Sequence, residues 1–476
     1  MISRPRKVGQ NVAPPSRLSF ELLFNNSQYK SPNFATHEPK FRKKSTKVSY
    51  VPAEFIERRI LNVARERLPE TAVLALQGAR SVGKSTVLAS IANEHQVDVI
   101  DLDNSAQAEL VGASPGDFVL GASPVCFDEY QRVPELLQAI KGELNRNHAP
   151  GRFVLTGSTR FDSLPRATQA LTGRIQFLEI LPFSQGEIDG VHEDFLDVAM
   201  RDPDQLLHHG PSTTMRADYA ERVCRGGLPI AISLNERGRR RWFDSYLAQT
   251  LSGDLPELGG IRRLDALTRL FDCLAGQTGQ LLNVRAAARA VELEGRTADN
   301  YTQLLSDVFL LRRLPAWGRT LRARSGKTPK LHMVDSGLAA HMLRLTPAKL
   351  AQLDPTSLTE FGHLLETFVA GELLKQASWH DDVREVAHWH THDDKEVDFL
   401  IETYDGGVVG FEIKARGKAI ADDLTGLRLL RELLGDQFRA GFILNIGKFA
   451  GRLEDRIYVL PIDRLWMTNA SVTESS

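Results

Sequence analysis

The sequence predicts an α/β protein: a parallel sheet with helices on both faces, then a helical region, then a second α/β unit. Three features lead to this prediction. In the first part of the chain, short apolar runs alternate with helix-compatible segments, which is typical of parallel sheets covered by helices. A glycine-rich turn at residues 78–85 joins the first apolar run to a helix. Near the C-terminus, Asp405-Gly406-Gly407 separates two further apolar runs and predicts a β-hairpin.

The composition is that of an ordinary globular protein. With 476 residues, of which 42% are hydrophobic and 25% charged, the chain can form two or three domains with separate cores. The formal net charge of -1 excludes a global nucleic-acid-binding signature. Three widely spaced cysteines argue against a disulfide framework and a thiolate metal cluster. The absence of an apolar run of about 18 residues predicts a cytoplasmic protein without a membrane span.

Residues 1–49 are predicted to form a tail, because prolines and asparagines interrupt any periodicity. Basic residues in this tail greatly outnumber Glu21 and Glu38. They are Arg4, Arg6, Lys7, Arg17, Lys30, Lys40, Arg42, Lys43, Lys44 and Lys47. A solvated, disordered extension and an arm that contacts nucleic acid are both compatible with this pattern.

The glycine-rich turn matches the phosphate-binding pattern G-x-x-x-x-G-K-[ST], between a predicted strand at residues 72–76 and a helix. Its glycines let backbone N–H groups converge on a phosphate, and the helix N-terminus adds partial positive charge. Lys84 can reach the β- and γ-phosphates, and the Ser85 hydroxyl can ligate Mg²⁺. The predicted nucleotide-binding residues are Gly78, Ala79, Arg80, Ser81, Val82, Gly83, Lys84, Ser85 and Thr86.

Two carboxylates follow a later apolar run, after a predicted buried strand at residues 97–102. The run at residues 124–127 ends in Asp128 and Glu129, about 45 residues beyond the phosphate loop. At the carboxyl end of a parallel strand, Asp128 would hold Mg²⁺ directly or through water. Glu129 would polarise the attacking water.

A further predicted strand at residues 152–155 is followed by polar residues that include Thr156 and Ser158. These hydroxyls can contact the γ-phosphate or the water, or they can cap the next turn. Arg174 is a candidate for stabilising transition-state charge, from its own chain or from a neighbouring subunit. A surface ion pair is the alternative for this arginine.

From about residue 202 to 345 the pattern is helical. Arg239, Arg240 and Arg241 precede a predicted aromatic-bearing helix at residues 242–251. The pattern predicts helices near residues 286–291 and 297–305, the second capped by Thr297, and an extended pair at 308–311. This order is typical of a winged helix. Such a module can enter a DNA groove or only pack domains together. Basic residues that keep DNA binding open are Arg312, Arg313, Arg319, Arg322, Arg324 and Lys327.

The C-terminal part places acidic residues on the predicted hairpin. Strands at residues 396–401 and 408–415 would bring Asp398, Glu412 and Lys414 together, with Glu366 arriving from a helix at residues 362–375. Two carboxylates and a lysine so arranged would bind a divalent cation and activate water against a phosphodiester. A hairpin with a salt-bridged polar face is the alternative.

Taken together, these motifs resemble a family of bacterial and archaeal ATP-binding proteins that join an AAA-type P-loop ATPase domain to a C-terminal region. The resemblance rests on GARSVGKST, CFDEYQRVPEL, VLTGSTR, LTGRI, RGGLP, KLHMVDSGL, ETFVAGEL, EVDFLI and FEIKA. It implies that the nucleotide is ATP rather than GTP and that Gly83, Lys84 and Ser85 bind it. It also implies that Asp128 and Glu129 bind the metal or activate the water. The C-terminal part resembles the PD-(D/E)XK nuclease fold.

The predicted divisions are a tail at 1–49, an ATPase domain at 50–200, a helical or winged-helix domain at 201–345 and a nuclease-like domain at 346–476. The resemblance and the motifs predict a Mg²⁺-dependent ATPase that couples hydrolysis to rearrangement of its C-terminal domains. An ATP-gated, metal-dependent DNA nuclease and a nucleotide-switched regulator that binds DNA or protein are the alternatives. Homo-oligomer formation stays open.

Overall fold

The computed structural model describes residues 56–161, 171–257, 259, 261–320, 328–352, 355–393 and 395–467. The chain divides into two units, Met1–Val51 and Pro52–Ser476, and every described residue belongs to the second. The predicted basic tail lies outside the described residues. Within the described ranges, no helix combines the length and the apolar character needed to cross a membrane.

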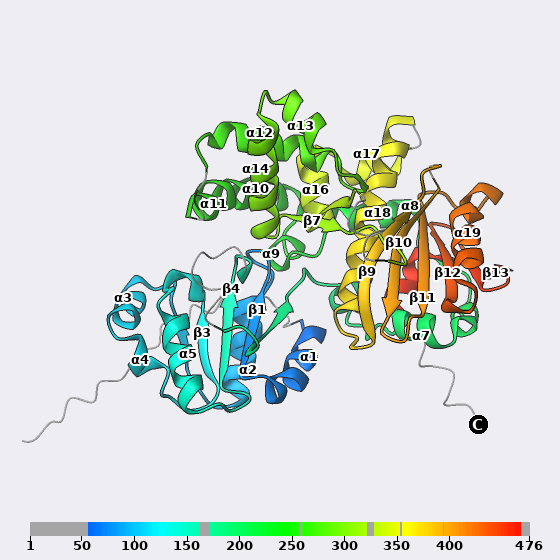
Figure 1. Cartoon of the computed structure of the whole chain (residues 1–476). Helices are drawn as coiled ribbons and strands as arrows, with labels where there is room; N and C mark the ends of the chain where they lie inside the picture. The colour runs from blue at the N-terminus through cyan, green and yellow to red at the C-terminus, as the bar shows by residue number, and fades with distance from the viewer. Residues whose placement is uncertain are drawn as a thin grey trace, which may run out of the picture. The chain divides into compact units, whose positions relative to one another are not determined.

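The first part of the second unit is a five-stranded parallel sheet in the order β2-β3-β4-β1-β5, as predicted (Figure 1). Its strands are β1 (Val73–Gln77), β2 (Val99–Asp101), β3 (Val125–Asp128), β4 (Phe153–Gly157) and β5 (Ile175–Glu179). Because all five strands run in the same direction, the segments that follow β1, β3 and β4 meet at one edge. This edge is where the candidate site is built.

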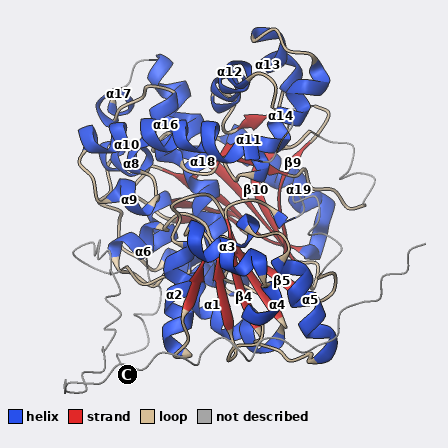
Figure 2. Cartoon of the chain, turned by 90° about the vertical axis from the view of Figure 1, so that its left-hand side faces the viewer, coloured by secondary structure: helices blue, strands red, loops and turns tan. Residues whose placement is uncertain are grey.

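Helices cover both faces of this sheet, because its central strands are apolar on both sides (Figure 2). Leu74 and Leu76 of β1 pack with α1 and α2 on one face, whereas Val73 and Phe127 pack with α5 on the other. The helices of this part are α1 (Arg59–Arg67), α2 (Lys84–Glu94), α3 (Ser105–Ala113), α4 (Pro115–Phe118), α5 (Leu136–Arg146) and α6 (Gln185–Asp189).

One strand differs from its prediction. The apolar run at residues 97–102 predicted a buried strand, but β2 lies at the sheet edge and its Asp101 is exposed. An edge strand has a single neighbour, so its apolar residues are only half covered. Apolarity alone does not distinguish an edge position from a central one.

The middle of the chain is largely helical and contains a small antiparallel sheet in the order β6-β8-β7. Its helices are α7 (Phe195–Arg201), α8 (Arg216–Arg225), α9 (Pro229–Ile232), α10 (Glu236–Gln249), α11 (Leu255–Glu257), α12 (Leu264–Ala275), α13 (Val284–Ala290), α14 (Gly295–Asp307), α16 (Ser336–Met342) and α17 (Pro347–Ala351). Its strands are β6 (Gln280–Leu281), β7 (Leu311–Leu314) and β8 (Lys330–Met333).

Two helix starts in this region differ from the sequence predictions. Helix α14 begins at Gly295, so Thr297 lies inside its first turn and does not cap it. Helix α10 begins at Glu236, so Arg239 and Arg240 lie within the helix and not ahead of it. Asn235 caps α10 by accepting the N–H of Gly238, a signal upstream of the arginines.

The C-terminal part is a mixed six-stranded sheet in the order β13-β14-β12-β11-β10-β9. The predicted hairpin is confirmed, since β10 and β11 pair antiparallel with Phe399 opposite Phe411. The long helix α18 and the helix α19 pack against opposite faces. The elements are α18 (Pro355–Ala377), β9 (Val383–His390), β10 (Glu396–Thr403), β11 (Val408–Lys414), α19 (Thr425–Leu434), β12 (Phe438–Asn445), β13 (Gly451–Glu454) and β14 (Ile457–Pro461).

Contacts tie the segment after the parallel sheet to the C-terminal sheet. The ring centroid of Phe195 in α7 lies 5.9 Å from that of Phe442 in β12. The backbone N–H of Gln185 donates to the Glu372 carboxylate of α18 at 2.8 Å. Helix α7 therefore packs on the C-terminal sheet, although all but the last of its residues fall inside the range predicted for the ATPase domain.

Candidate nucleotide-binding site

The loop between β1 and α2 closes tightly against the chain that follows β5. A Cβ atom on Gly78 would lie 2.3 Å from the carbonyl oxygen of Ile180, so a larger residue does not fit. Gly83 has a φ of 98°, a left-handed conformation that glycine adopts without strain. Helix α2 begins at Lys84, so its amino-terminal partial positive charge lies at the loop.

The side chain of Lys84 is buried inside the loop. Its Nζ atom donates to the carbonyl oxygens of Gly78 at 3.1 Å and Ala79 at 2.9 Å. Burying an ammonium group without such acceptors would be costly. A bound phosphate would offer charged acceptors, which form stronger hydrogen bonds than neutral carbonyls.

Arg58, a residue that belongs to no motif, ties the phosphate loop to the segment after β5. Its guanidinium donates to the carbonyl oxygens of Val82 and Leu181, each at 2.7 Å. The Arg58 Nε atom lies 3.2 Å from the Glu187 carboxylate, and the guanidinium lies over the ring of Phe183. The rigid fork of donors makes Arg58 a positioning residue for the loop.

Asp128 and Glu129 lie at the edge of the sheet that carries the loop, and Thr156 joins them. The Thr156 hydroxyl donates to the Asp128 carboxylate and accepts the N–H of Glu129 at 3.0 Å. Burial raises the pKa of Asp128, although hydrogen bonds from Thr156 and Ser85 act to lower it. A serine hydroxyl beside a carboxylate is an oxygen donor set that fits Mg²⁺.

Glu129 is held in a fixed orientation by two neighbours. Its carboxylate accepts hydrogen bonds from the Ser158 hydroxyl at 3.1 Å and from the Gln131 amide. The Gln131 amide also donates to Ser158 at 3.0 Å. Glu129 has a φ of 54°, an uncommon left-handed conformation for a residue with a side chain, and such residues cluster at functional sites.

A cavity of about 320 Å³ lies over the phosphate loop. Part of its wall is the loop, from Arg80 to Thr86, with Glu129. The rest belongs to α9, the end of α10 and the π-helical turn at Thr250–Asp254, and consists of Pro229, Ile230, Tyr246, Gln249 and Thr250. This volume is in the range of small-molecule sites, and π-helical turns are frequent at functional sites.

Arg174 lies at the amino-terminal end of the parallel strands, opposite the end that carries the phosphate loop. It precedes β5, whose Ile175 pairs with Val73 at the start of β1, whereas the loop follows Gln77 at the end of β1. Its guanidinium donates to the Asn145 side chain at 2.7 Å. Five strand residues span about 17 Å, so a role in cis does not fit this placement. A role from a neighbouring subunit stays a prediction.

The C-terminal carboxylates surround a lysine that the motifs do not reveal. The Nζ atom of Lys330, the first residue of β8, lies 2.7 Å from Asp398 and 2.8 Å from Glu366. It also lies 3.6 Å from Glu396. The ammonium therefore lies between Asp398 and Glu366, two of the carboxylates that the sequence offered as metal ligands. Over the described ranges, no group of three or more His, Cys, Asp or Glu side chains is placed to hold a metal ion.

The same carboxylates form a buried ion network, named here the Lys330 cluster: Lys330, Glu366, Asp398, Glu412 and Lys414. Burial alone would raise the pKa of Asp398, but the charges of Lys330 and Lys414 hold it below its usual range. Burial and the Asp398 charge raise the pKa of Glu366 to about 8. They also raise the pKa of Glu412, which pairs with Lys414. These ion pairs are compatible with the salt-bridged alternative, and a metal site at Asp398 and Glu412 stays a prediction.

Basic residues after α14 are partly used within the chain. Arg312 of β7 forms an ion pair with Glu179 at the end of β5. Arg319 donates to the carbonyl oxygen of Leu433 at 3.3 Å. Arg322, Arg324 and Lys327 lie outside the described residues. Arg312 and Arg319 therefore contribute to packing of the chain.

Three residues that shape these sites have weak sequence signals. Gln131 follows Glu129 by two positions, so its proximity could have been inferred. Arg58 contacts Leu181, which lies 123 positions later in the chain. Lys330 contacts Asp398, which lies 68 positions later. The one sequence signal for Lys330 is its position at the start of an apolar strand, which is an unusual place for an isolated charge.

Family models match three parts of the chain. Residues 70–189 match the model of the AAA domain. Residues 216–349 match a domain of unknown function, DUF8612, and residues 361–465 match another, DUF4143. The AAA match includes the phosphate loop, both carboxylates of β3 and the polar end of β4.

Complete proteins with similar sequences or structures also exist. Uncharacterized proteins of Mycobacterium bovis and Mycobacterium tuberculosis are each 26% identical to this chain over 93% of its length and 91% of theirs. A Walker-type ATPase of Pyrococcus abyssi is similar with a TM-score of 0.36 and 15% identity, covering 61% of this chain and 96% of that one. Residues 70–189 match the AAA model, and the parallel sheet carries the phosphate loop at the expected place. The chain therefore contains an AAA-type P-loop ATPase domain.

Proposed function

We propose that this protein is a Mg²⁺-dependent ATPase that couples hydrolysis to rearrangement of its C-terminal domains. The observation that carries this proposal is the composition of the 320 Å³ cavity. The phosphate loop and Glu129 line it together with α9 and the end of α10. Loss of a γ-phosphate changes the charge at this wall, so the helices that line it respond directly.

Each side chain then has a role set by its position. Lys84 and the loop N–H groups bind the β- and γ-phosphates, and Glu129, oriented by Ser158, polarises the attacking water. Thr156 holds the Asp128 carboxylate and the backbone of Glu129 in register. Ser85 and Asp128 are the residues that would hold Mg²⁺, which would neutralise phosphate charge when bound.

A short chain of contacts supports coupling between the cavity and the C-terminal sheet. Helix α9 follows the turn at Gly226 and Gly227, and the Asp335 carboxylate accepts the Gly227 N–H at 2.7 Å. A Cβ atom on Gly226 would lie 2.2 Å from Asp335, so this contact is close-packed. Asp335 follows β8, whose first residue, Lys330, belongs to the Lys330 cluster. The segment from Lys330 to Asp335 thus contacts both regions.

The element order around β8 supports the winged-helix prediction. Helix α12 is followed by β6, then by α13 and α14, and finally by the paired strands β7 and β8. Ala298, Tyr301 and Leu305 of α14 are buried in the core of the chain. We therefore infer that this module transmits motion between domains in preference to entering a DNA groove.

Hydrogen exchange tests the coupling. In the Glu129→Gln variant, which retains bound ATP because hydrolysis is slowed, ATP is expected to change exchange at residues 330–345 and 361–377 relative to ADP. The reason is that these segments carry Asp335, Lys330 and Glu366. The Lys84→Ala variant serves as the control and should show no ATP-dependent change. Changes confined to residues 78–94 and 229–250 would contradict coupling to the C-terminal domain.

The second candidate, an ATP-gated nuclease, is favoured by the convergence of Asp398, Glu412 and Lys414 across the hairpin. We expect no nicking of supercoiled plasmid with ATP and Mg²⁺ or Mn²⁺, because the Lys330 ammonium occupies the space between Asp398 and Glu366. Nicking that disappears in Asp398→Ala would overturn this expectation. Tight ATP binding with slow turnover would instead favour the nucleotide-switched regulator.

A further inference from the structure

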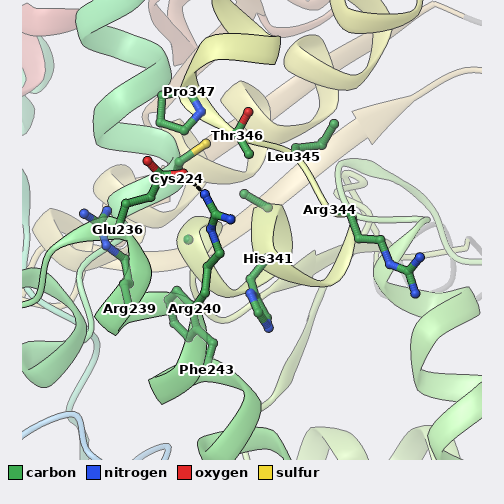
Figure 3. Close-up of a pocket in the computed structure, with 12 residues that line it drawn as sticks. Cys224, Glu236, Arg239, Arg240, Phe243, His341, Arg344, Leu345, Thr346 and Pro347 are labelled. Carbon is green, nitrogen blue, oxygen red and sulfur yellow. Dashed lines mark hydrogen bonds and ion pairs between the residues drawn. The ribbon is translucent and has the colours of Figure 1, made fainter.

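A second cavity, of about 260 Å³, lies between the start of α10 and the end of α16 (Figure 3). It shares no lining residue with the cavity over the phosphate loop. Its polar lining contains three arginines and a single carboxylate: Cys224, Glu236, Arg239, Arg240, His341, Arg344 and Thr346. All of these residues lie within the range matched to DUF8612.

Arg239 is the residue that points to a ligand. Its side chain is only 10% exposed, and its nearest carboxylate, Glu221, lies 3.6 Å from the guanidinium. The Leu234 carbonyl oxygen, at 3.5 Å, is at the limit of hydrogen bonding. The Nε donor is buried and finds no acceptor among the described residues. Burying a donor of a charged group without an acceptor is costly, so Arg239 is incompletely paired by the described residues.

The other side chains of the cavity leave positive charge in excess. Arg240 pairs with Glu236 one turn earlier on α10, so these two charges compensate each other. His341 contacts Asp244 outside the cavity at 2.9 Å. Figure 3 shows Arg240 and His341 side by side, with Arg239 to one side and Arg344 to the other.

The remaining lining residues add no compensating charge. Burial raises the pKa of the Cys224 thiol to about 12, so Cys224 is neutral at physiological pH. Arg344 adopts a left-handed φ of 55° at the exposed side of the cavity. The nearest carboxylate to Arg239 is Glu221, which does not line the cavity, and the one lining carboxylate, Glu236, is already paired with Arg240.

We propose that this cavity binds a small organic oxyanion that carries a carboxylate or phosphate group. The planar fork of a guanidinium matches both groups, and Thr346 can add a hydroxyl hydrogen bond. At about 30 Å³ per water molecule the cavity holds about nine waters, which suits a metabolite and not a peptide. Binding here does not depend on the proposed ATPase cycle.

The position of the cavity gives such a ligand access to the nucleotide site. Helix α10 lines this cavity with Arg239 and Phe243 and lines the cavity over the phosphate loop with Tyr246 and Gln249. A ligand that orders the first half of α10 would therefore act on the wall of the nucleotide cavity through one continuous helix.

Calorimetric titration tests the proposal, with inorganic phosphate and citrate as separate probes. The full-length Lys84→Ala chain is used, so that the phosphate loop does not dominate anion binding. Saturable binding of at least one probe is expected, and the one preferred distinguishes a phosphate from a carboxylate ligand. Adding Arg239→Gln should weaken binding at least tenfold. Adding Arg241→Gln, which removes the same charge from an exposed position of α10 outside the cavity, should leave it unchanged.

Absence of binding by both probes, or equal weakening by the two α10 variants, would overturn the proposal. Arg344→Gln provides a second test if Arg239→Gln does not fold, because Arg344 is exposed and its replacement should be tolerated. It should also weaken binding, whereas unchanged affinity in a folded Arg344→Gln protein would contradict the assignment. Since binding is measured without hydrolysis, failure here is separate from failure of the ATPase proposal.

Discussion

Replacement of Lys84 by alanine is expected to abolish ATP turnover by the purified chain. Lys84 is 4% exposed, and its ammonium is held inside the phosphate loop by two carbonyl oxygens. An ammonium 4 Å from a phosphate charge is worth about 4 kcal/mol at an effective dielectric constant of 20. Because a difference of about 1.4 kcal/mol is tenfold in rate, turnover should fall by at least about a hundredfold. Phosphate release with ATP and Mg²⁺ is the measurement.

Two further variants make the result specific. Lys141→Ala, on the partly exposed face of α5, changes the same residue type away from the site and should leave turnover unaltered. Glu129→Gln should retain ATP binding while hydrolysis falls, because it keeps the shape of the side chain and removes its basicity. Unchanged turnover in Lys84→Ala would refute the assignment of the loop as the hydrolytic site.

Replacement of Lys330 by methionine is expected to destabilise the chain by about 3–5 kcal/mol, because it removes one partner from a buried ion network. Asp398 and Glu366 would lose an ammonium at 2.7 and 2.8 Å. Equilibrium urea unfolding provides the measurement. Lys418→Met, at an exposed position of the same region, is the control and should change stability by less than about 0.5 kcal/mol.

A double variant identifies the cause of the loss. If the loss arises from unpaired carboxylates, Lys330→Met with Asp398→Asn should be more stable than Lys330→Met alone. Added Mn²⁺ should raise the unfolding midpoint of Lys330→Met and leave that of the native chain unchanged, because only the variant has an open position between the carboxylates. A double variant less stable than the single one would show that Lys330 acts by packing.

The same cluster predicts a pH dependence. Folding raises the pKa of Glu366 from 4.5 to about 8, so the folded chain binds an extra proton between these values. The stability contributed by this protonation is present below pH 4.5 and is lost as the pH rises through 8. Without Lys330 the carboxyl groups must stay protonated to be buried. The destabilisation by Lys330→Met should therefore be larger at pH 8 than at pH 5.

Much of the parallel sheet could be predicted because its signals are local. Strands β1, β3 and β4 are short apolar runs, and the loop after β1 follows a pattern in which glycine, lysine and serine have separate tasks. The hairpin of β10 and β11 has a turn sequence of its own. Such features depend on neighbours within a few positions, and the residues themselves are sufficient to indicate them.

Other features depend on contacts between distant residues. The edge position of β2 depends on which strands pair, and apolar content does not determine this. The placement of Arg174 away from the loop follows from the direction of β5. Helices α9 and α10 complete the cavity only because the middle of the chain folds back over the loop. None of these arrangements has a local pattern.

Local sequence patterns were enough to predict the phosphate loop, the carboxylates at the end of β3 and the order of apolar runs that becomes a parallel sheet. The cation that lies beside the C-terminal carboxylates depends on tertiary structure. Asp398 and Glu366 had the residue types of a metal site, but Lys330 approaches from a strand 68 positions earlier and contacts both carboxyl groups. The physical reason is that a carboxylate cluster suits an ammonium as well as a divalent cation, and only packing determines which cation reaches it.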